Sequence, residues 1–314
     1  MAGYLRFLTR SNKFARIPLA QRNLVLKCLP ERREAELLKA VIIYSVLFYL
    51  IPFCLSLAIS ILKKGKAALE WTPGMVKGST TNIALSVMNI LVAPAIYLLN
   101  DGARQVYDAL NILHIPVETW AGMPLVFLII FSLVIQDFAD YWNHRFLHAP
   151  GIWPIHAVHH SDPDMNHTTA LRVHILESFV MTTSYTLLLS WLGLPPVAAA
   201  GLAMFRSLYN KFVHVDVDIH FGPLCKWIAT PRYHQWHHAN DAKAFNKNFA
   251  NIFSVWDVMF GTYYVPGPCN RPLGFEGSPH HDLSRLFFWP LLEWGKLIIP
   301  HLPEKHRASD SAKA

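Results

Sequence analysis

Apolar residues in this chain gather into long runs that carry no charge. The first run extends from Val41 to Leu62 and stops at Lys63, and two more extend from Thr80 to Asn100 and from Thr119 to Gln136. A helix of about 20 apolar residues is long enough to cross the hydrocarbon core of a bilayer. The pattern therefore predicts three membrane-spanning helices, although a buried core helix would show a similar pattern.

A fourth uncharged run, from Ser178 to Phe205, is interrupted by Gly193-Leu194-Pro195-Pro196. Because proline breaks the hydrogen bonds of a helix, this run predicts two helices that form a hairpin dipping into the bilayer. The segment from Leu286 to Ile299 mixes two tryptophans with a glutamate and a lysine. That mixture is typical of a helix that lies in the membrane interface and does not cross it.

The composition agrees with a membrane protein. Of the 314 residues, 53% are hydrophobic and 16% are charged, whereas about 25% of the residues in soluble domains are charged. This balance excludes a disordered or collagen-like chain. The four cysteines form no Cys-x-x-Cys pair, which argues against a thiolate zinc site or a dense disulfide framework; they are Cys28, Cys54, Cys225 and Cys269.

Most of the net charge of +7 lies at the N-terminus. Residues 1–40 contain nine lysines and arginines but only three glutamates. A basic arm that precedes an apolar run suits the anionic surface of a membrane. Nucleic acid is the competing partner for such an arm, but we do not expect it because the chain shows no nucleic-acid-binding motif.

Histidine is the residue type in excess. The chain has 17 histidines, and 12 of them lie between His144 and His238. They form an HxxxH pair at 144–148 and two HxxHH triplets at 156–160 and 234–238. On an α-helix, residues three and four positions apart share a face, so each motif can aim its rings at one centre.

These motifs indicate bound metal. Neutral imidazole is a good ligand for Fe, Zn, Cu and Ni. A structural zinc uses four ligands and a catalytic zinc about three, so the eight rings of the motifs exceed the needs of one ion. We therefore expect two metal ions. A lone HxxxH pair could arise by chance, but a solvated helix face gives no reason for two triplets of identical spacing.

The expected fold is all-α: an integral membrane protein with three to four spans or hairpins and a histidine-rich, metal-binding helical cap. We divide the chain into a basic arm at 1–40, a single membrane-embedded domain at 41–303 with its core at 119–265, and a polar tail at 304–314. The basic arm favours a cytoplasmic N-terminus. Three spans would then place the histidines outside. If the first two apolar runs are re-entrant or interfacial, the number of crossings changes, and with it the side on which the histidines lie. We expect the histidine motifs on the cytoplasmic side.

The residues around the motifs add a family resemblance. They read Asp140-Tyr-Trp-Asn-His-Arg-Phe-Leu-His148, Trp153-Pro-Ile-His-Ala-Val-His-His-Ser161 and Thr230-Pro-Arg-Tyr-His-Gln-Trp-His-His238. This pattern resembles the fatty acid hydroxylase and sterol desaturase superfamily. The segment from Asn166 to His174 is similar to bacterial members and to the alkylglycerol monooxygenase branch. With the segment from Trp256 to Thr262, the likeness covers roughly residues 135–265.

The resemblance implies an oxygenase with a non-haem di-iron centre, which uses O2 and two electrons to hydroxylate or desaturate a lipid C–H bond. It also implies one more histidine ligand before the last motif. His214 is where we expect that ligand, and His220 is the rival. The ligands carried over by position are His144, His148, His156, His159, His160, His214, His234, His237 and His238.

Other residues are candidates to orient these ligands. A ligating histidine usually donates its second N–H to a carboxylate or carbonyl. Glu177 is a further residue that could take this orienting role. The alternative for all of these residues is that they cap a helix or are charges in contact with solvent. Arg172 and Lys211 could instead contact lipid phosphates. The candidates for orienting ligands are Asp140, His174, Asp216 and His220.

We therefore expect a membrane di-iron enzyme that hydroxylates a fatty acyl, sterol or related lipid, with two bound iron ions and O2 as co-substrate. Desaturation at the same site is an alternative. Because the chain has no Rossmann glycine motif and no CxxCH motif, electrons must come from a separate donor; the resemblance implies a cytochrome b5, ferredoxin or pterin type. A metal transporter or sensor is the alternative of another class, but the predicted spans carry few ionisable residues.

Overall fold

The computed structural model describes residues 43, 50–100, 102–194 and 196–298. The chain divides into two units, Met1–Ile51 and Pro52–Ala314, of which only the second is described over most of its length. The basic arm at 1–40 and the polar tail at 304–314 lie outside the described residues. So do residues 41, 42 and 44–49 of the predicted span from Val41 to Leu62, whereas its second part belongs to a helix.

Within the described part of the chain, every regular element is helical, and the only β pairing there is an isolated bridge between Ala239 and Leu273. This confirms the predicted all-α class. Short 3-10 turns connect several helices. The α-helices are α3 (Ile51–Lys64), α4 (Pro73–Asn100), α5 (Ala103–Ala109), α6 (Leu125–Leu147), α7 (Trp153–His160), α8 (Ile175–Leu192), α9 (Pro196–Val213), α10 (Pro231–His238), α11 (Val255–Met259) and α12 (Leu283–Ile298).

Helix α6 corrects the predicted span from Thr119 to Gln136. It begins only after Pro124, whose backbone is not helical (φ −56°, ψ 133°), and it continues well past Asp137. The buried carboxylate of Asp137 accepts hydrogen bonds from the backbone N–H groups of Ile252 and Phe253, each at 2.9 Å. Because these hydrogen bonds stabilise the buried carboxylate, the helix can continue through Asp137. One continuous helix therefore contains both the apolar run and the first histidine of the HxxxH pair.

The fourth apolar run breaks where the sequence predicts. Helix α8 ends at Gly193, which has the left-handed conformation (φ 65°) that glycine adopts at low cost, and α9 begins at Pro196. The two helices are longer than the predicted run from Ser178 to Phe205, starting earlier at Ile175 and ending later at Val213. The extension at the end of α9 brings the chain directly to His214.

Two of the described helices, α6 and α8, are long and apolar enough to cross a membrane. The predicted run from Thr80 to Asn100 forms most of α4. The predicted interfacial segment corresponds to α12, which buries Leu286 and Trp289 while Leu291 stays exposed. Together with the helical fold, these features agree with an all-α membrane protein.

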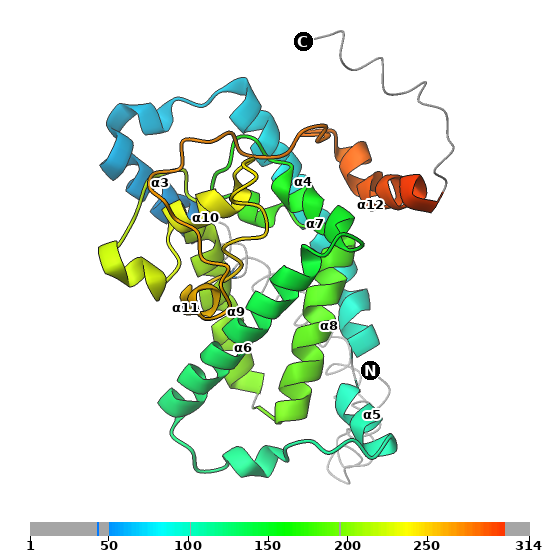
Figure 1. Ribbon diagram of the computed structural model, residues 1–314. Coiled ribbons are helices and arrows are strands. Elements are labelled where there is room, and N and C mark those ends of the chain that lie inside the picture. The colour runs from blue at the N-terminus through cyan, green and yellow to red at the C-terminus, as the bar shows by residue number, and fades with distance from the viewer. Residues whose placement is uncertain (1–42, 44–49, 101, 195, 299–314) are drawn as a thin grey trace, which may run out of the picture. The chain divides into compact units, whose positions relative to one another are not determined.

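The helices meet near the histidine motifs. Helix α4 packs against α8, α9 packs against α6, and α12 packs against α7. Figure 1 shows α6 and α8 coming together at the end where α7 lies, and α9 leading toward α10. The short helices α7 and α10 contact these longer helices directly, α7 on α6 and α8 and α10 on α9. Residues from distant parts of the chain are thereby gathered at one end of the helices.

Arg172 is one of the residues that hold this end together. The sequence suggests contact with lipid phosphates for Arg172 and Lys211, but both side chains are buried. The Arg172 guanidinium donates hydrogen bonds to the Val158 carbonyl and to Asn82 Oδ1, each at 3.0 Å, and to the Ser161 hydroxyl at 2.8 Å. It thus ties α4 to the end of α7, and the lipid-contact interpretation was wrong for this residue.

Candidate metal centre

The helices that carry the HxxHH triplets are short and begin at defined residues. Pro154 lies in the first turn of α7 and Pro231 in the first turn of α10. Proline at this position loses no helical hydrogen bond. The Thr230 hydroxyl also accepts a hydrogen bond from the Tyr233 N–H at 3.3 Å and so caps α10. These signals set the start of each helix and hence the direction of its histidines.

The structure brings together all nine histidines that the sequence suggests as ligands. They form two groups, and within each group one ligand atom per residue lies within 4.8 Å of every other. All are buried except His144 and His148, which are half-buried. The five-histidine group consists of His144, His148, His156, His160 and His237, and the four-histidine group consists of His159, His214, His234 and His238.

Each HxxHH triplet is divided between the two groups, whereas the sequence suggests one centre per triplet. His156 and His160 belong to the five-histidine group, but His159 belongs to the four-histidine group. In the other triplet, His234 and His238 belong to the four-histidine group, whereas His237 belongs to the five-histidine group. The reason is helical geometry: residues four apart lie close in direction, whereas adjacent residues differ by about 100° around the axis.

The spacing of the ring nitrogens fits metal ions. In the four-histidine group, His214 Nε2 lies 3.2 Å from His159 Nε2 and 3.0 Å from His234 Nε2. In the five-histidine group, the Nε2 atoms of His144 and His156 are 3.0 Å apart. Two nitrogens that bind one ion at about 2.1 Å lie about 3.0–3.4 Å from each other. The observed distances fall in or at the edge of this range.

Buried ring nitrogens without a hydrogen-bond partner also indicate that the histidines bind metal. Among the described residues, the Nε2 atoms of His148, His160 and His237 are buried without a hydrogen-bond partner, as are the Nδ1 atoms of His234 and His238. A buried polar atom without a partner is costly and calls for an explanation, such as an ion. The donor set, all neutral nitrogen, is one that Fe, Zn, Cu or Ni can accept.

Backbone carbonyls orient four of the rings. The Nδ1 atoms of His144 and His237 lie 2.7 Å from the Phe249 carbonyl and 2.8 Å from the Lys247 carbonyl. His159 and His214 use the carbonyls of Arg172 and Asn210 in the same way, at 3.1 Å and 2.6 Å. A carbonyl can only accept, so Nδ1 carries the proton and Nε2 is left with a free lone pair for a metal.

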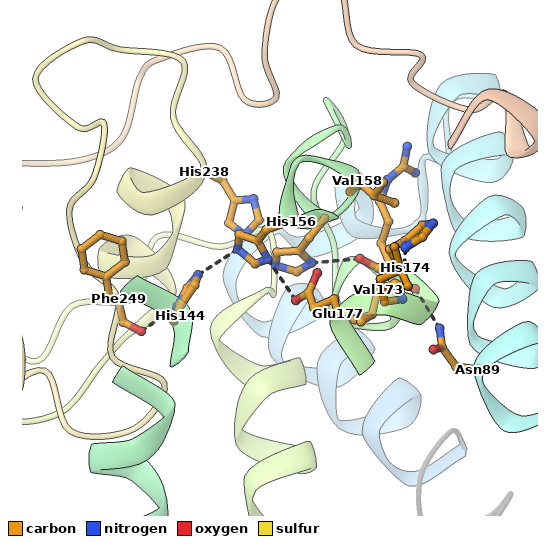
Figure 2. Close-up of polar contacts among 12 residues, drawn as sticks. Asn89, His144, His156, Val158, Val173, His174, Glu177, His238 and Phe249 are labelled. Atoms are coloured by element: carbon orange, nitrogen blue, oxygen red, sulfur yellow. Dashed lines mark hydrogen bonds and ion pairs between the residues drawn. The ribbon is translucent and has the colours of Figure 1, made fainter. Parts of the chain in front are cut away.

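Glu177 is the carboxylate that takes part in this orientation. Its Oε1 atom lies 2.9 Å from His156 Nδ1, and the side chains of both residues are buried. Figure 2 shows Glu177 reaching from α8 to the His156 ring. The other carboxylate oxygen, Oε2, is buried without a partner among the described residues. An acceptor of this kind makes the opposite ring nitrogen a stronger ligand.

The four sequence candidates for this orienting role make their hydrogen bonds and ion pairs elsewhere in the described residues. Asp140 forms an ion pair with Arg206, and exposed Asp216 forms one with Lys64 at 2.6 Å. His174 caps α8, accepting from the Leu176 N–H at 3.1 Å.

The fourth candidate, His220, was also the rival of His214 as a ligand. It accepts from the Gly222 N–H at 3.1 Å, and its Nε2 lies 2.9 Å from Cys225 Sγ. It belongs to neither histidine group. No local signal in the sequence distinguishes Glu177 from the four candidates, because its distance to His156 depends on how α7 and α8 pack.

We expect Glu177→Gln to weaken metal binding by the five-histidine group by about tenfold or more, since the carboxylate charge on the His156 partner is lost. Metal titration of the purified protein, monitored at the two sites separately, measures the effect. Asp216→Asn is the matched control, because Asp216 contacts Lys64 and should leave both affinities unchanged. Equal affinities in wild type and Glu177→Gln would remove Glu177 from the metal centre.

The electrostatics keep the rings neutral. Burial lowers the pKa of His148, His156 and His160 well below the ordinary value of 6.5, and neighbouring histidines lower it further. Burial likewise lowers the pKa of His214 to about 4. The same direction and leading cause hold for His159, His234, His237 and His238. At neutral pH these rings are therefore unprotonated, which is the state that binds metal.

A cavity of about 380 Å³ opens next to both groups. Its wall includes His144 and His156 from the five-histidine group and His159 and His234 from the four-histidine group. Apolar side chains of α6 and α8 form another part of the wall, among them Leu147 and Met181. A small molecule in this cavity would touch both groups at once.

Comparison with known proteins agrees with this site. Residues 129–262 match the fatty acid hydroxylase family, close to the range over which the motifs resemble it. The chain is 30% identical to human alkylglycerol monooxygenase over 223 residues, which is 69% of this chain and 46% of that protein. No solved structure gives a significant match.

Two further relatives act on other lipids. The ornithine lipid hydroxylase of Rhizobium tropici is 29% identical over 52% of this chain and 50% of its own length. A Delta(7)-sterol 5(6)-desaturase of Gibberella zeae is 27% identical over 59% of this chain and 50% of its own length. The chain thus spans about half the length of the curated relatives it matches. The family match, these relatives and the histidine motifs together make the chain similar to the fatty acid hydroxylase and sterol desaturase superfamily.

Proposed function

We propose that this protein is a membrane-bound non-haem di-iron oxygenase that hydroxylates a C–H bond of a lipid, using O2 and electrons from a separate donor. The observation that carries the proposal is the pair of adjacent, neutral histidine groups that line one cavity. Relatives named as a lipid monooxygenase, a lipid hydroxylase and a sterol desaturase support the reaction class. Oxidation of a lipid C–H bond needs redox chemistry that side chains lack, and bound iron would supply it.

The chain's own residues have distinct tasks in this proposal. The five-histidine group would hold one ion and the four-histidine group the other, with Nε2 of His144, His156, His159 and His214 turned inward by the acceptors on Nδ1. Glu177 holds His156 and places a second carboxylate oxygen at the cavity. Leu147 and Met181 keep an apolar wall against which an alkyl chain can pack.

The helices suggest how substrate arrives. The cavity lies against α6 and α8, the two described helices suited to crossing a membrane. A lipid could therefore move from the bilayer into the cavity without passing through water. We propose a multi-pass protein with its histidine motifs on the cytoplasmic side, where a donor of the cytochrome b5, ferredoxin or pterin type would supply electrons. The basic arm at 1–40 would bind the anionic membrane surface.

The test is metal content together with product. We expect about two irons per chain in protein purified without oxygen, and a lipid product that gains one oxygen atom only when O2 and a reductant are present. A product that instead lacks two hydrogens would assign desaturation, which the sterol desaturase relative favours as the second candidate. Metal uptake into vesicles without O2 consumption would replace the oxygenase by a transporter.

Matched variants extend this test to the ninth ligand. His214→Ala should reduce the iron content from about two to about one per chain, because His214 contacts both His159 and His234 in the four-histidine group. His220→Ala should leave the iron content unchanged, since its ring nitrogens face Gly222 and Cys225. The opposite pattern would assign the ligand to His220.

A further inference from the structure

The cavity beside the metal centre also has a polar wall that the proposed chemistry does not use. Arg206 on α9 lines it together with Asp140 on α6 and Tyr185 on α8. The Arg206 guanidinium forms an ion pair with Asp140 and donates to the Tyr185 hydroxyl at 2.7 Å and to Gln136 Oε1 at 3.3 Å. We call Gln136, Asp140, Tyr185 and Arg206 the Arg206 cluster.

The charges within the Arg206 cluster cancel. The side chains of Arg206 and Asp140 are only 13% and 6% exposed, and each provides the other's counter-charge. The guanidinium carbon also lies 4.5 Å from the centre of the Tyr185 ring, which fixes that side chain. An anionic ligand would meet the Asp140 carboxylate as well as Arg206 and would gain little. The cluster is therefore suited to an uncharged polar group.

The two residues of the cluster that carry donors and line the cavity, Tyr185 and Arg206, each have a donor without an acceptor among the described residues. Tyr185 accepts from Arg206 through its oxygen, and no described residue accepts its hydroxyl proton. Arg206 Nε is buried and has no partner among the described residues. A buried donor without an acceptor costs about 1–3 kcal/mol. Since both residues line the cavity, an acceptor oxygen of a bound ligand would remove this cost.

The cluster is close to the metal centre. Asp140 precedes His144 on α6 by four residues, which is about 6 Å along the helix axis. Both residues line the same cavity. An oxygen held at the cluster would therefore lie only a few bonds from a carbon placed against the histidines.

We propose that the Arg206 cluster is a binding subsite for an uncharged acceptor oxygen of the lipid substrate: an ether, an ester or amide carbonyl, or a hydroxyl near the carbon that reacts. Tyr185 O–H and Arg206 Nε–H donate to that oxygen, and the alkyl chain lies along Leu147 and Met181. The assignment rests on the proposed function for the identity of the reacting carbon. As a binding site it stands on the cavity and its free donors alone.

The test uses the full-length protein as purified, placed in lipid nanodiscs, and three probes. 1-Methoxyhexadecane and octadecane have the same chain length and differ by one ether oxygen in place of a CH2 group, and hexadecanoate adds the anionic case. A ligand that binds the folded state raises the unfolding midpoint, and at equal concentration the ligand with the lower Kd raises it further, because the stabilisation grows with the logarithm of concentration over Kd. We expect the ether to bind at least about three- to tenfold more tightly than the alkane, since each hydrogen bond to its oxygen contributes about that factor, and we expect no gain for the anion.

Tyr185→Phe is the informative variant. It should reduce the preference for the ether over the alkane by about three- to tenfold, because one of the two donors to the oxygen is gone. Tyr107→Phe is the matched control: it also removes a tyrosine hydroxyl, but that hydroxyl donates to the Leu187 carbonyl, away from the cavity. The control should keep the preference for the ether. Comparing two probes within each variant cancels any loss of stability that the substitution itself causes.

Equal binding of ether and alkane by the wild type, or an unchanged ether preference in Tyr185→Phe, would overturn the subsite. Stronger binding of hexadecanoate than of the ether would also overturn it in favour of a carboxylate site. These outcomes are independent of iron content and O2 consumption. A protein that binds the ether selectively but consumes no O2 would contradict the proposed function and leave the subsite standing.

Discussion

His237→Ala is expected to reduce product formation by at least about a hundredfold while the protein remains folded and inserted in the membrane. His237 is buried in the five-histidine group, and its unpartnered Nε2 is one of the five nitrogens gathered there. Its ring centre lies 4.4 Å from that of His144 and 4.6 Å from that of His160. Loss of a residue that merely orients a ligand costs about 10–100-fold in metal affinity or activity, so loss of a ligand should cost more.

Three measurements check this expectation: iron per chain, product from a lipid extract, and the elution profile of the detergent-solubilised protein. His114→Ala is the control, since His114 lies outside both groups and its Nδ1 contacts the Ile112 carbonyl. It should match wild type in all three. Turnover and iron content that persist in His237→Ala would exclude His237 from the metal centre.

Asp257→Ala is expected to lower the free energy of unfolding by about 3–5 kcal/mol. The Asp257 carboxylate is fully buried and accepts from the backbone N–H groups of Phe249 and Ala250 at 2.8 and 2.9 Å. It also accepts from the Tyr233 hydroxyl and, at 2.7 Å, from the Thr262 hydroxyl. Alanine would leave the Phe249 N–H and the Tyr233 hydroxyl proton buried without the acceptor that Asp257 provides, which is the costly way to remove a hydrogen bond.

The same substitution should also loosen the metal centre. Phe249, whose N–H is held by Asp257, supplies the carbonyl that His144 Nδ1 contacts at 2.7 Å. Chemical denaturation in detergent micelles measures the stability, and metal titration measures the second effect. Asp108→Ala, at an exposed site on α5, should change the stability by less than about 0.5 kcal/mol. A similarly small change in Asp257→Ala would show that the buried hydrogen bonds at Asp257 are not needed for the fold.

The hydrogen bonds of Asp257 help to fix a non-helical segment that orients two histidines of the metal centre. Residues 246–254 form no helix, yet the carbonyls of Lys247 and Phe249 orient His237 and His144. Asp137 and Asp257 fix this segment from opposite ends through bonds to its backbone N–H groups. Two carboxylates that look like ordinary surface charges in the sequence therefore position the histidines indirectly.

Local features of the sequence predicted what depends on nearest neighbours along the chain. The HxxxH and HxxHH spacings are properties of a single helical turn, so they could be recognised without knowing how helices pack. The same holds for the break between α8 and α9, since glycine and proline act on the backbone at their own positions. The end of a span was harder to place: Asp137 ends an apolar run, but not the helix, because its bonds come from residues more than a hundred positions away.

By itself, the sequence determined that this protein is helical and rich in membrane-suited segments, that it resembles a histidine-motif superfamily, and that its motifs supply eight histidines suited to metal. Only the tertiary structure decided that each triplet is shared between two groups, that His214 and not His220 lies among them, and that Glu177 contacts His156. The structure alone also revealed the Arg206 cluster, whose members come from three helices. The physical reason is that packing between helices sets these distances, and the separation of two residues along the chain carries no information about their separation in space.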